Sequence, residues 1–218
     1  MVIDLHTHSL ASDGALLATE LIRRAEVAGY SHIAITDHAG AGSLGRVISE
    51  VGSDCRLMAD AVGLKSYVGV ELTHIPPSDI ARLATEARTL GAQIVVVHGE
   101  SLAEPVMEGT NLAAAACSDV DILAHPGSIT PEAAALAAEN GVLLELTARG
   151  GHDRGNGHVA AAAAKAGAAV IVNSDAHGPL DLLTTERAHD IASGAGLDEA
   201  ATHAALRGNA ERLLADLQ

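Results

Sequence analysis

About seven short apolar runs alternate with longer helix-like segments along the chain, and this alternation limits the possible folds more than any other feature. Runs such as 93–98 (QIVVVH) and 121–125 (DILAH) are apolar almost throughout, rather than at every second residue. Continuous hydrophobicity of this kind is typical of strands that are buried on both faces of a parallel sheet and joined by helices. The sequence therefore predicts an α/β fold with a parallel sheet.

The order of the predicted elements repeats from end to end. We expect a strand at the N-terminus and further strands over residues 32–38, 65–74, 93–98, 121–125, 142–147 and 169–173. Helices are expected over 16–28, 46–62, 78–91, 112–117, 130–141, 158–166, 182–192 and 198–217. Gly52 is predicted to interrupt the second helix, and Ser78 is predicted to cap the third.

Histidines and carboxylates recur where different predicted strands end. They are His6, His8, His38, Glu71, His98, His125, Asp175 and His177. Side chains from so many strands can meet at one point only if the sheet curls, which favours a barrel over an open sheet. No linker or change of composition divides the chain, so we expect one domain over residues 1–218.

The first strand carries the most distinctive motif, 4–8 (DLHTH). Its alternating pattern directs His6 and His8 to the same side of a strand. Twelve histidines among 218 residues are a surplus. Imidazole combined with carboxylate suits Zn, Mn and Fe. The sequence therefore predicts a site for divalent metal ions at the strand ends.

Composition excludes several other classes of protein. The formal net charge of −15 disfavours nucleic acid as the main partner, because phosphate contacts need clustered Lys and Arg. Cys55 and Cys117 lack metal-finger spacing and indicate free thiols. The chain starts directly with a strand and has no apolar run of membrane-spanning length. We expect a cytoplasmic protein without a membrane partner, and a homo-oligomer stays open.

The polar motifs appear in a fixed order along nearly the whole chain. They are 4–8 (DLHTH) with 12–14 (SDG), 36–38 (TDH), Glu71, His98, 125–126 (HP), 174–177 (SDAH) and 209–214 (NAERLL). This ordered set resembles the PHP (polymerase and histidinol phosphatase) family of metal-dependent phosphoesterases. The resemblance implies a distorted (β/α)7, TIM-like barrel that holds two or three divalent metal ions.

The resemblance also implies which residues bind each ion. The first ion would take His6, His8, Glu71 and Asp175. The second would take Glu71, as a bridge, with His98 and His125. The third would take Asp13, His38 and His177. Some family members have His at the position of Asp13, so the third site is harder and favours Mn or Fe over Zn. Asp37 is expected to orient an imidazole.

The implied chemistry is hydrolysis of a small phosphomonoester, as in a histidinol phosphatase, by a metal-bound hydroxide at a trinuclear site. We place Asp175, His177, Arg149 and His152 in the catalytic set. Arg149 follows the sixth predicted strand, where a guanidinium could bind phosphate oxygens, and His152 could protonate the leaving oxygen. A small phosphorylated metabolite is therefore the expected partner, with histidinol phosphate, nucleotides and sugar phosphates all open.

Three other functions compete with this hypothesis. An amidohydrolase also begins with HxH, but it usually needs a Lys at a strand end, and Lys65 and Lys165 are predicted elsewhere. A PHP-type nuclease or phosphodiesterase is disfavoured because the sequence shows neither a basic groove nor aromatic residues for base stacking. A non-catalytic metal-binding module would keep the ligands without a substrate pocket.

Overall fold

A computed structural model describes residues 1–215 and 217 of the chain. Its strands are β1 (Val2–Asp4), β2 (Tyr30–Ile35), β3 (His38–Ala39), β4 (Lys65–Leu72), β5 (Ile94–His98), β6 (Ile122–Ala124), β7 (Leu143–Thr147) and β8 (Val170–Asn173). The sheet runs β1-β2-β4-β5-β6-β7-β8, with β3 beside β4, and all these pairs are parallel.

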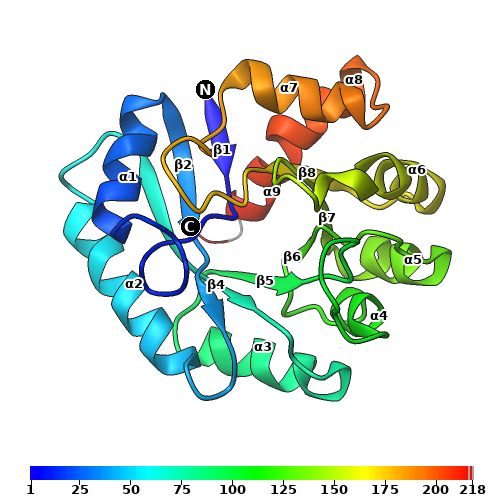
Figure 1. Cartoon of the computed structure of the whole chain (residues 1–218), viewed down its shortest axis with the longest axis horizontal. Coiled ribbons are helices and arrows are strands. Elements are labelled where there is room, and N and C mark those ends of the chain that lie inside the picture. The colour runs from blue at the N-terminus through cyan, green and yellow to red at the C-terminus, as the bar shows by residue number, and fades with distance from the viewer. Residues whose placement is uncertain (216, 218) are drawn as a thin grey trace.

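The first six helices lie between strands in sequence and outside them in space, and the last three follow β8 (Figure 1). The helices are α1 (Ala18–Val27), α2 (Leu44–Met58), α3 (Ile80–Thr89), α4 (Thr110–Ala115), α5 (Pro131–Asn140), α6 (Asn156–Ala166), α7 (Thr185–Gly194), α8 (Glu199–His203) and α9 (Asn209–Ala215). Short 3-10 turns cover Pro77–Asp79 and Asp153–Gly155, and a π-helical turn covers Ala204–Gly208.

The first and last strands meet just beyond their carboxyl ends. The amide of Asp175 donates to the carbonyl of His6 (3.0 Å), and the amide of His8 donates to the carbonyl of Ala176 (2.8 Å). Lower down, the amide of Leu5 donates to Oδ1 of Asn173 (2.9 Å). These bonds bring the two edges of the sheet together, so the sheet is a nearly closed barrel and the predicted fold class is confirmed.

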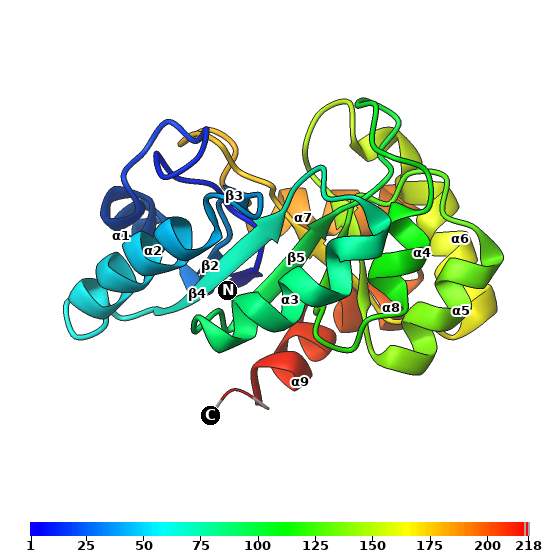
Figure 2. The same cartoon turned by 90° about the horizontal axis from the view of Figure 1, so that it is seen from below.

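Aliphatic side chains fill the inside of the barrel. The inner cluster is Ile3, Leu5, Ala34, Tyr67, Ile94, Val96, Ile122, Ala124, Leu143, Ile171, Ala210 and Leu214. The last two come from α9, which lies beneath the strands at the end away from the loops that follow them (Figure 2). The side-chain Nδ2 of Asn209 also donates to the carbonyl of Val170 (2.7 Å). The α9 helix therefore closes this end and leaves the carboxyl ends of the strands for polar groups.

Several predicted boundaries need correction. Helix α2 continues through Gly52, which is buried against Val68 of β4, so packing outweighs the intrinsic cost of glycine in a helix. Ser78 lies within a 3-10 turn, and α3 begins only at Ile80. The predicted helix over 182–192 starts at Thr185, because Thr184 caps it by accepting from the amide of Arg187 (3.1 Å). The second strand ends at Ile35.

Other segments differ in extent rather than in kind. The predicted last helix, 198–217, is split into α8, a π-helical turn and α9, and its residue 216 lies outside the described residues.

Cys55 and Cys117 are both buried free thiols, as predicted. Among the helices of residues 1–215, none combines the length and the hydrophobicity that crossing a bilayer requires.

Gly69 in β4 provides a test of the packing inside the barrel. A Cβ atom at this position would lie 2.5 Å from Cγ2 of Thr36 and 3.0 Å from the carbonyl oxygen of Ile35. We expect Gly69→Ala to lower the free energy of unfolding by about 1–3 kcal/mol, the usual cost of overpacking. Urea denaturation followed by circular dichroism measures this change.

Gly45 in α2 is the matched control, because a Cβ there meets no atom within 4 Å. Gly45→Ala should raise the free energy of unfolding by about 0.5–1 kcal/mol through helix propensity. Equal effects of the two substitutions would contradict the close packing around Gly69.

Candidate metal centre

All the residues predicted as metal ligands lie at the same end of the barrel, where the strands end. Their nitrogen and oxygen atoms form overlapping groups in which every atom lies within 4.8 Å of the others. The strands position them because parallel neighbours present their carboxyl ends along one rim. The predicted convergence therefore occurs, whereas the assignment of each side chain to an ion stays a prediction.

The first group surrounds the carboxylate of Asp175. Its Oδ1 lies 3.2 Å from Nε2 of His8 and 3.8 Å from Nε2 of His6. Oε2 of Glu71 lies 3.4 Å from the same nitrogen of His6 and 3.6 Å from that of His8. The side chains of His6, His8 and Glu71 are fully buried. These four residues are the ones predicted for the first ion.

Glu71 lies at the centre of the cluster. Its Oε1 is 3.1 Å from Nδ1 of His98 and 3.8 Å from Nε2 of His125, the partners predicted for the second ion. Its Oε2 faces His6 and lies 2.7 Å from Nδ1 of His38. Each oxygen thus faces different imidazoles, which is the arrangement a bridging carboxylate requires. The proximity of His38 to Glu71 was not anticipated.

The third group lies nearer to solvent. Oδ1 of Asp13 is 3.3 Å from Nε2 of His177 and 3.6 Å from Nε2 of His38. His8 joins this group, and its ring stacks on that of His177 at a centroid distance of 4.2 Å. The side chain of Asp13 is 56% exposed, so it is the most accessible of these groups. The predicted trio therefore comes together, with His8 as an additional neighbour.

Burial and charge act against each other on the central carboxylates. Burial alone would raise the pKa of Glu71, but His6 and His38 outweigh it and lower that pKa well below its usual range. Burial likewise opposes ionisation of Asp175, and His6 and His8 lower its pKa overall. Burial lowers the pKa of His125 well below its usual value. Burial would lower the pKa of His6 as well, but Glu145 and Glu71 outweigh it and raise that pKa, so binding of a cation would release a proton from this imidazole.

The cluster contains buried polar atoms that the protein does not satisfy. Within residues 1–215 and 217, seven such atoms at the strand ends and the loops beside them lack a hydrogen-bond partner: His6 Nε2, His8 Nδ1 and Nε2, Glu71 Oε2, His98 Nε2, His125 Nδ1 and His152 Nδ1. An unpaired buried polar atom costs about 1–3 kcal/mol. Divalent cations would supply the missing partners, so the residues present fit a metal centre.

Glu145 in β7 supports this centre and was missed by the sequence analysis. Its Oε1 lies 2.8 Å from Nδ1 of His6 and accepts from Nδ2 of Asn173 (2.9 Å). Its Oε2 accepts from the amide of His125 (3.1 Å). A carboxylate on one imidazole nitrogen orients the other nitrogen toward a metal. The signal was present, because Glu145 is the charged residue in the apolar run 142–147.

Asp37 does not orient an imidazole, contrary to the prediction. Its Oδ1 accepts from the amides of Ser9 (2.8 Å) and Ser12 (3.1 Å), and both serine hydroxyls also donate to its carboxylate. Ser9 and Ser12 belong to the segment between β1 and α1, which bends back over β2. Their donors therefore occupy the carboxylate of Asp37 in place of an imidazole. Asp37 therefore fixes the loop that carries Asp13.

Two residues of the cluster hold the backbone in the left-handed region. His125 has φ 29° and Asp175 has φ 52°, although neither is glycine. Such conformations cost about 1–3 kcal/mol each and persist where the surroundings impose them. At both residues the chain leaves its strand, so the strained turn aims the side chain into the barrel mouth.

Arg149 and His152 lie beside the cluster in the segment after β7. Arg149 lines a cavity of about 220 Å³ with Ser174 and Asp181, and its Nη1 is 3.8 Å from Oδ2 of Asp181. The ring of His152 lies 4.5 Å from that of His125, centroid to centroid. Burial lowers the pKa of His152. His152 thus lies against a predicted ligand and Arg149 lies beside the segment after β8, and the catalytic roles of both stay predictions.

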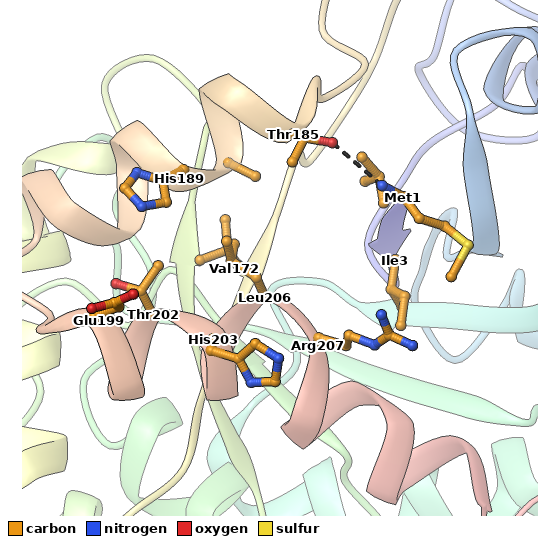
Figure 3. Close-up of a pocket in the computed structure, with 12 residues that line it drawn as sticks. Met1, Ile3, Val172, Thr185, His189, Glu199, Thr202, His203, Leu206 and Arg207 are labelled. Atoms are coloured by element: carbon orange, nitrogen blue, oxygen red, sulfur yellow. Dashed lines mark hydrogen bonds between the residues drawn. The ribbon is translucent and has the colours of Figure 1, made fainter.

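A cavity of about 340 Å³ beside the first residues of β1 is separate from the cluster (Figure 3). Met1 and Ile3 line it together with residues of α7 and α8, and the amino group of Met1 donates to Oγ1 of Thr185 (3.5 Å). None of the predicted metal ligands is among its lining residues, so it belongs to a different part of the molecule.

Comparison with known proteins settles the family. The family model described as "PHP domain" matches residues 4–140, well over half of the chain. The chain belongs to the PHP family. It is also 46% identical over 204 residues to the uncharacterized protein MJ1295 of Methanocaldococcus jannaschii, a match that covers 90% of this chain and 91% of that protein.

Solved structures share the barrel fold of this chain. One neighbour is a chain of the cryo-EM structure of archaeal ribonuclease P with mature tRNA, with a TM-score of 0.72 and 17% identity over 97% of this chain and 90% of that chain. Another is the histidinol phosphate phosphatase of Lactococcus lactis subsp. lactis, complexed with Zn, L-histidinol and phosphate. Its TM-score is 0.60, with 16% identity over 90% of this chain and 94% of that chain. At these identities the likeness concerns the fold.

The position of the lysines bears on the amidohydrolase alternative. Lys65 is the first residue of β4, at the opposite end of that strand from Glu71, and Lys165 lies in α6. Neither reaches the strand ends where a bridging lysine would be needed. This placement agrees with the PHP assignment.

Replacing Glu145 tests how the PHP centre is organised. In the wild-type protein three donors share the carboxylate of Glu145. The side-chain amide of Glu145→Gln has one acceptor oxygen for these donors, and the negative charge that orients His6 is lost. We expect the affinity for Zn²⁺ to fall about 10–100-fold, as is usual for such supporting residues. Isothermal titration of the metal-free protein measures this affinity.

Glu139→Gln is the control, because Glu139 lies exposed on α5 and should leave zinc affinity unchanged. Both variants should keep the wild-type circular dichroism spectrum. An unaltered zinc affinity in a folded Glu145→Gln protein would show that Glu145 does not position His6.

Proposed function

We propose that the protein is a metal-dependent phosphoesterase that hydrolyses small phosphomonoesters at the carboxyl ends of its strands. The observation that carries the proposal is the buried cluster of imidazoles and carboxylates with unsatisfied atoms, next to a guanidinium at the mouth. Bound divalent cations would supply an activated water molecule and stabilise charge on the phosphoryl oxygens. Zn, Mn and Fe all suit these ligands.

Charge balance explains how an acidic protein could attract a phosphate. Three divalent cations would add about +6, and the formal charges of Asp13, Glu71, Glu145 and Asp175 would return −4, which leaves roughly +2 at the mouth. The formal charge of −15 on the whole chain is therefore compatible with an anionic substrate. Within this proposal the nine predicted ligands keep the ion assignments that the family resemblance implies.

The residues around the mouth have distinct roles in the proposal. Arg149 would bind phosphate oxygens, since its side chain is 35% exposed and lines the cavity next to Ser174. Asp181 links Arg149 to the segment that carries His177, because its Oδ2 faces Arg149 and accepts from the amide of His177 (3.0 Å). His152 would lie near the leaving oxygen, where a neutral imidazole can donate a hydrogen bond. The Lactococcus lactis enzyme, complexed with L-histidinol and phosphate, supports a monoester.

A phosphate-release screen tests the proposal. The metal-free protein is loaded with Zn²⁺, Mn²⁺ or Fe²⁺ and supplied with histidinol phosphate, nucleoside monophosphates and sugar phosphates. We expect release from at least one class, and loss of that release in His6→Ala. If circular dichroism shows that this variant keeps the folded barrel, the loss of phosphate release comes from the missing imidazole and not from unfolding. Absence of release from the whole panel with every metal would refute the proposal.

Arg149→Ala tests the role of the guanidinium. We expect KM for the phosphorylated substrate to rise about 10–100-fold, which corresponds to loss of a charge-assisted hydrogen bond of about 1.5–3 kcal/mol. Metal content, measured by mass spectrometry, should not change. Arg212→Ala in α9, at the far end of the barrel, is the matched control. Loss of metal from Arg149→Ala would show that the residue has a different role.

Phosphodiester or nucleic-acid substrates form a second candidate. Arg154 and Arg187 line a polar cavity of about 490 Å³ that adjoins the one beside Arg149, although Asp153 and Asp190 also line it. The structural neighbour from archaeal ribonuclease P with mature tRNA supports testing this class. Including 5′-phosphorylated oligonucleotides in the same screen separates the two functions, because only a nuclease would release mononucleotides.

A further inference from the structure

One group of side chains that could hold a metal ion includes two residues from outside the proposed ligand set. One ring nitrogen each of His74 and His98 and a carboxylate oxygen of Glu104 all lie within 4.8 Å of one another. His74 and Glu104 come from the segments that follow β4 and β5, and neither is among the predicted ligands. The geometry points to a further site for a divalent cation of the Zn²⁺ type, formed by His74, His98 and Glu104 at the rim of the barrel. We call it the rim site.

The distances fit a shared cation. Oε2 of Glu104 lies 3.2 Å from Nε2 of His98 and 3.5 Å from Nε2 of His74. Zinc binds imidazole nitrogen and carboxylate oxygen at about 2.0–2.2 Å, so two ligands of a tetrahedral ion lie roughly 3.3–3.5 Å apart. Both observed separations are therefore close to the edge of a zinc tetrahedron.

A direct hydrogen bond does not account for the same contact. His98 is only 3% exposed, and its Nε2 is among the buried atoms that lack a hydrogen-bond partner although a Glu104 oxygen lies 3.2 Å away. The nitrogen is therefore not aligned for donation to that oxygen. A cation between the two atoms would satisfy both without that alignment.

His74 is held in an unusual conformation that brings it to this position. Its φ is 51°, in the left-handed region, immediately after β4 and its Glu71. Its ring stacks on that of His98, with a centroid distance of 5.4 Å and an interplanar angle of 29°. Strained backbone of this kind is concentrated at functional sites. The turn brings Nε2 of His74 to 3.5 Å from Oε2 of Glu104.

The imidazole ring of His98 would connect the rim site to the proposed metal centre. Nδ1 of His98 lies 3.1 Å from Oε1 of Glu71, on the inner side, and Nε2 faces Glu104, on the outer side. With a cation on each nitrogen the ring would release its N–H proton to solvent. Because the side chains of His74 (47%) and Glu104 (41%) are partly exposed, the remaining coordination positions would be open to water or a ligand.

Zinc stoichiometry tests the rim site in the full-length protein. Wild type, His74→Asn, Glu104→Gln and the double variant are equilibrated with Zn²⁺, and bound zinc per chain is measured by mass spectrometry. Asn tolerates positive φ, so His74→Asn removes the ligand while it keeps the turn. Each single variant and the double variant should bind one zinc fewer than wild type.

Controls separate loss of a ligand from loss of the fold. His189→Asn on α7 and Glu108→Gln on the loop of Glu104 change exposed residues of the same types and should keep the wild-type number of ions. Circular dichroism should be unchanged throughout. The site is overturned if either single variant binds as much zinc as wild type, or if the double variant loses more than one ion.

The proposed phosphoesterase function is judged separately. The zinc count involves no substrate, so a failure to release phosphate leaves this experiment unaffected. Conversely, the protein could release phosphate while the two variants bind as much zinc as wild type. That result would support the proposed function and overturn the rim site.

Discussion

The burial of ionised carboxylates among imidazoles is the constraint on which the rest of this structure depends. Glu71 and Glu145 are both fully buried, each against His6, and no lysine or arginine among the described residues pairs with either of them. Removing charges from water costs several kcal/mol per ion unless partners compensate. The imidazoles compensate in part, and the unsatisfied atoms that remain define where cations would be required. Metal binding and stability of the barrel mouth are therefore coupled in this chain.

The seam between β8 and β1 shows how the fold delivers this chemistry. Asn173 donates to Glu145 across to β7 and accepts from the amide of Leu5 in the segment after β1. Asp4 adds a second link, because its carboxylate accepts from the amide of Ser174 (3.1 Å) and from the hydroxyl of Tyr30 (3.2 Å). Burial raises the pKa of Asp4 to about 6. The polar groups that close the barrel are thus continuous with those that surround the predicted ions.

The sequence predicts the barrel and the convergence of its strand ends, because predicted ligands such as His98 and Glu71 stand at or near the ends of apolar runs. It does not reveal contacts between segments that are distant along the chain. Glu104 lies in a loop without any pattern, and its carboxylate meets His98 only after β5 and the following loop are folded. Helix α2 continues through Gly52 because β4 packs against that glycine, which local propensity cannot indicate. Asp37 likewise binds the loop that folds over it.

The left-handed residues His74, His125 and Asp175 have an evolutionary consequence. Glycine would relieve each of these turns, so substitutions that abolish the side chain would ease backbone strain and would not be opposed by folding alone. Where such a chain had lost its need for metal, drift toward glycine at these three positions would leave a stable, inert barrel. Histidine and aspartate at these turns thus cost the fold strain that glycine would relieve, so their side chains, and not the backbone, account for their presence there.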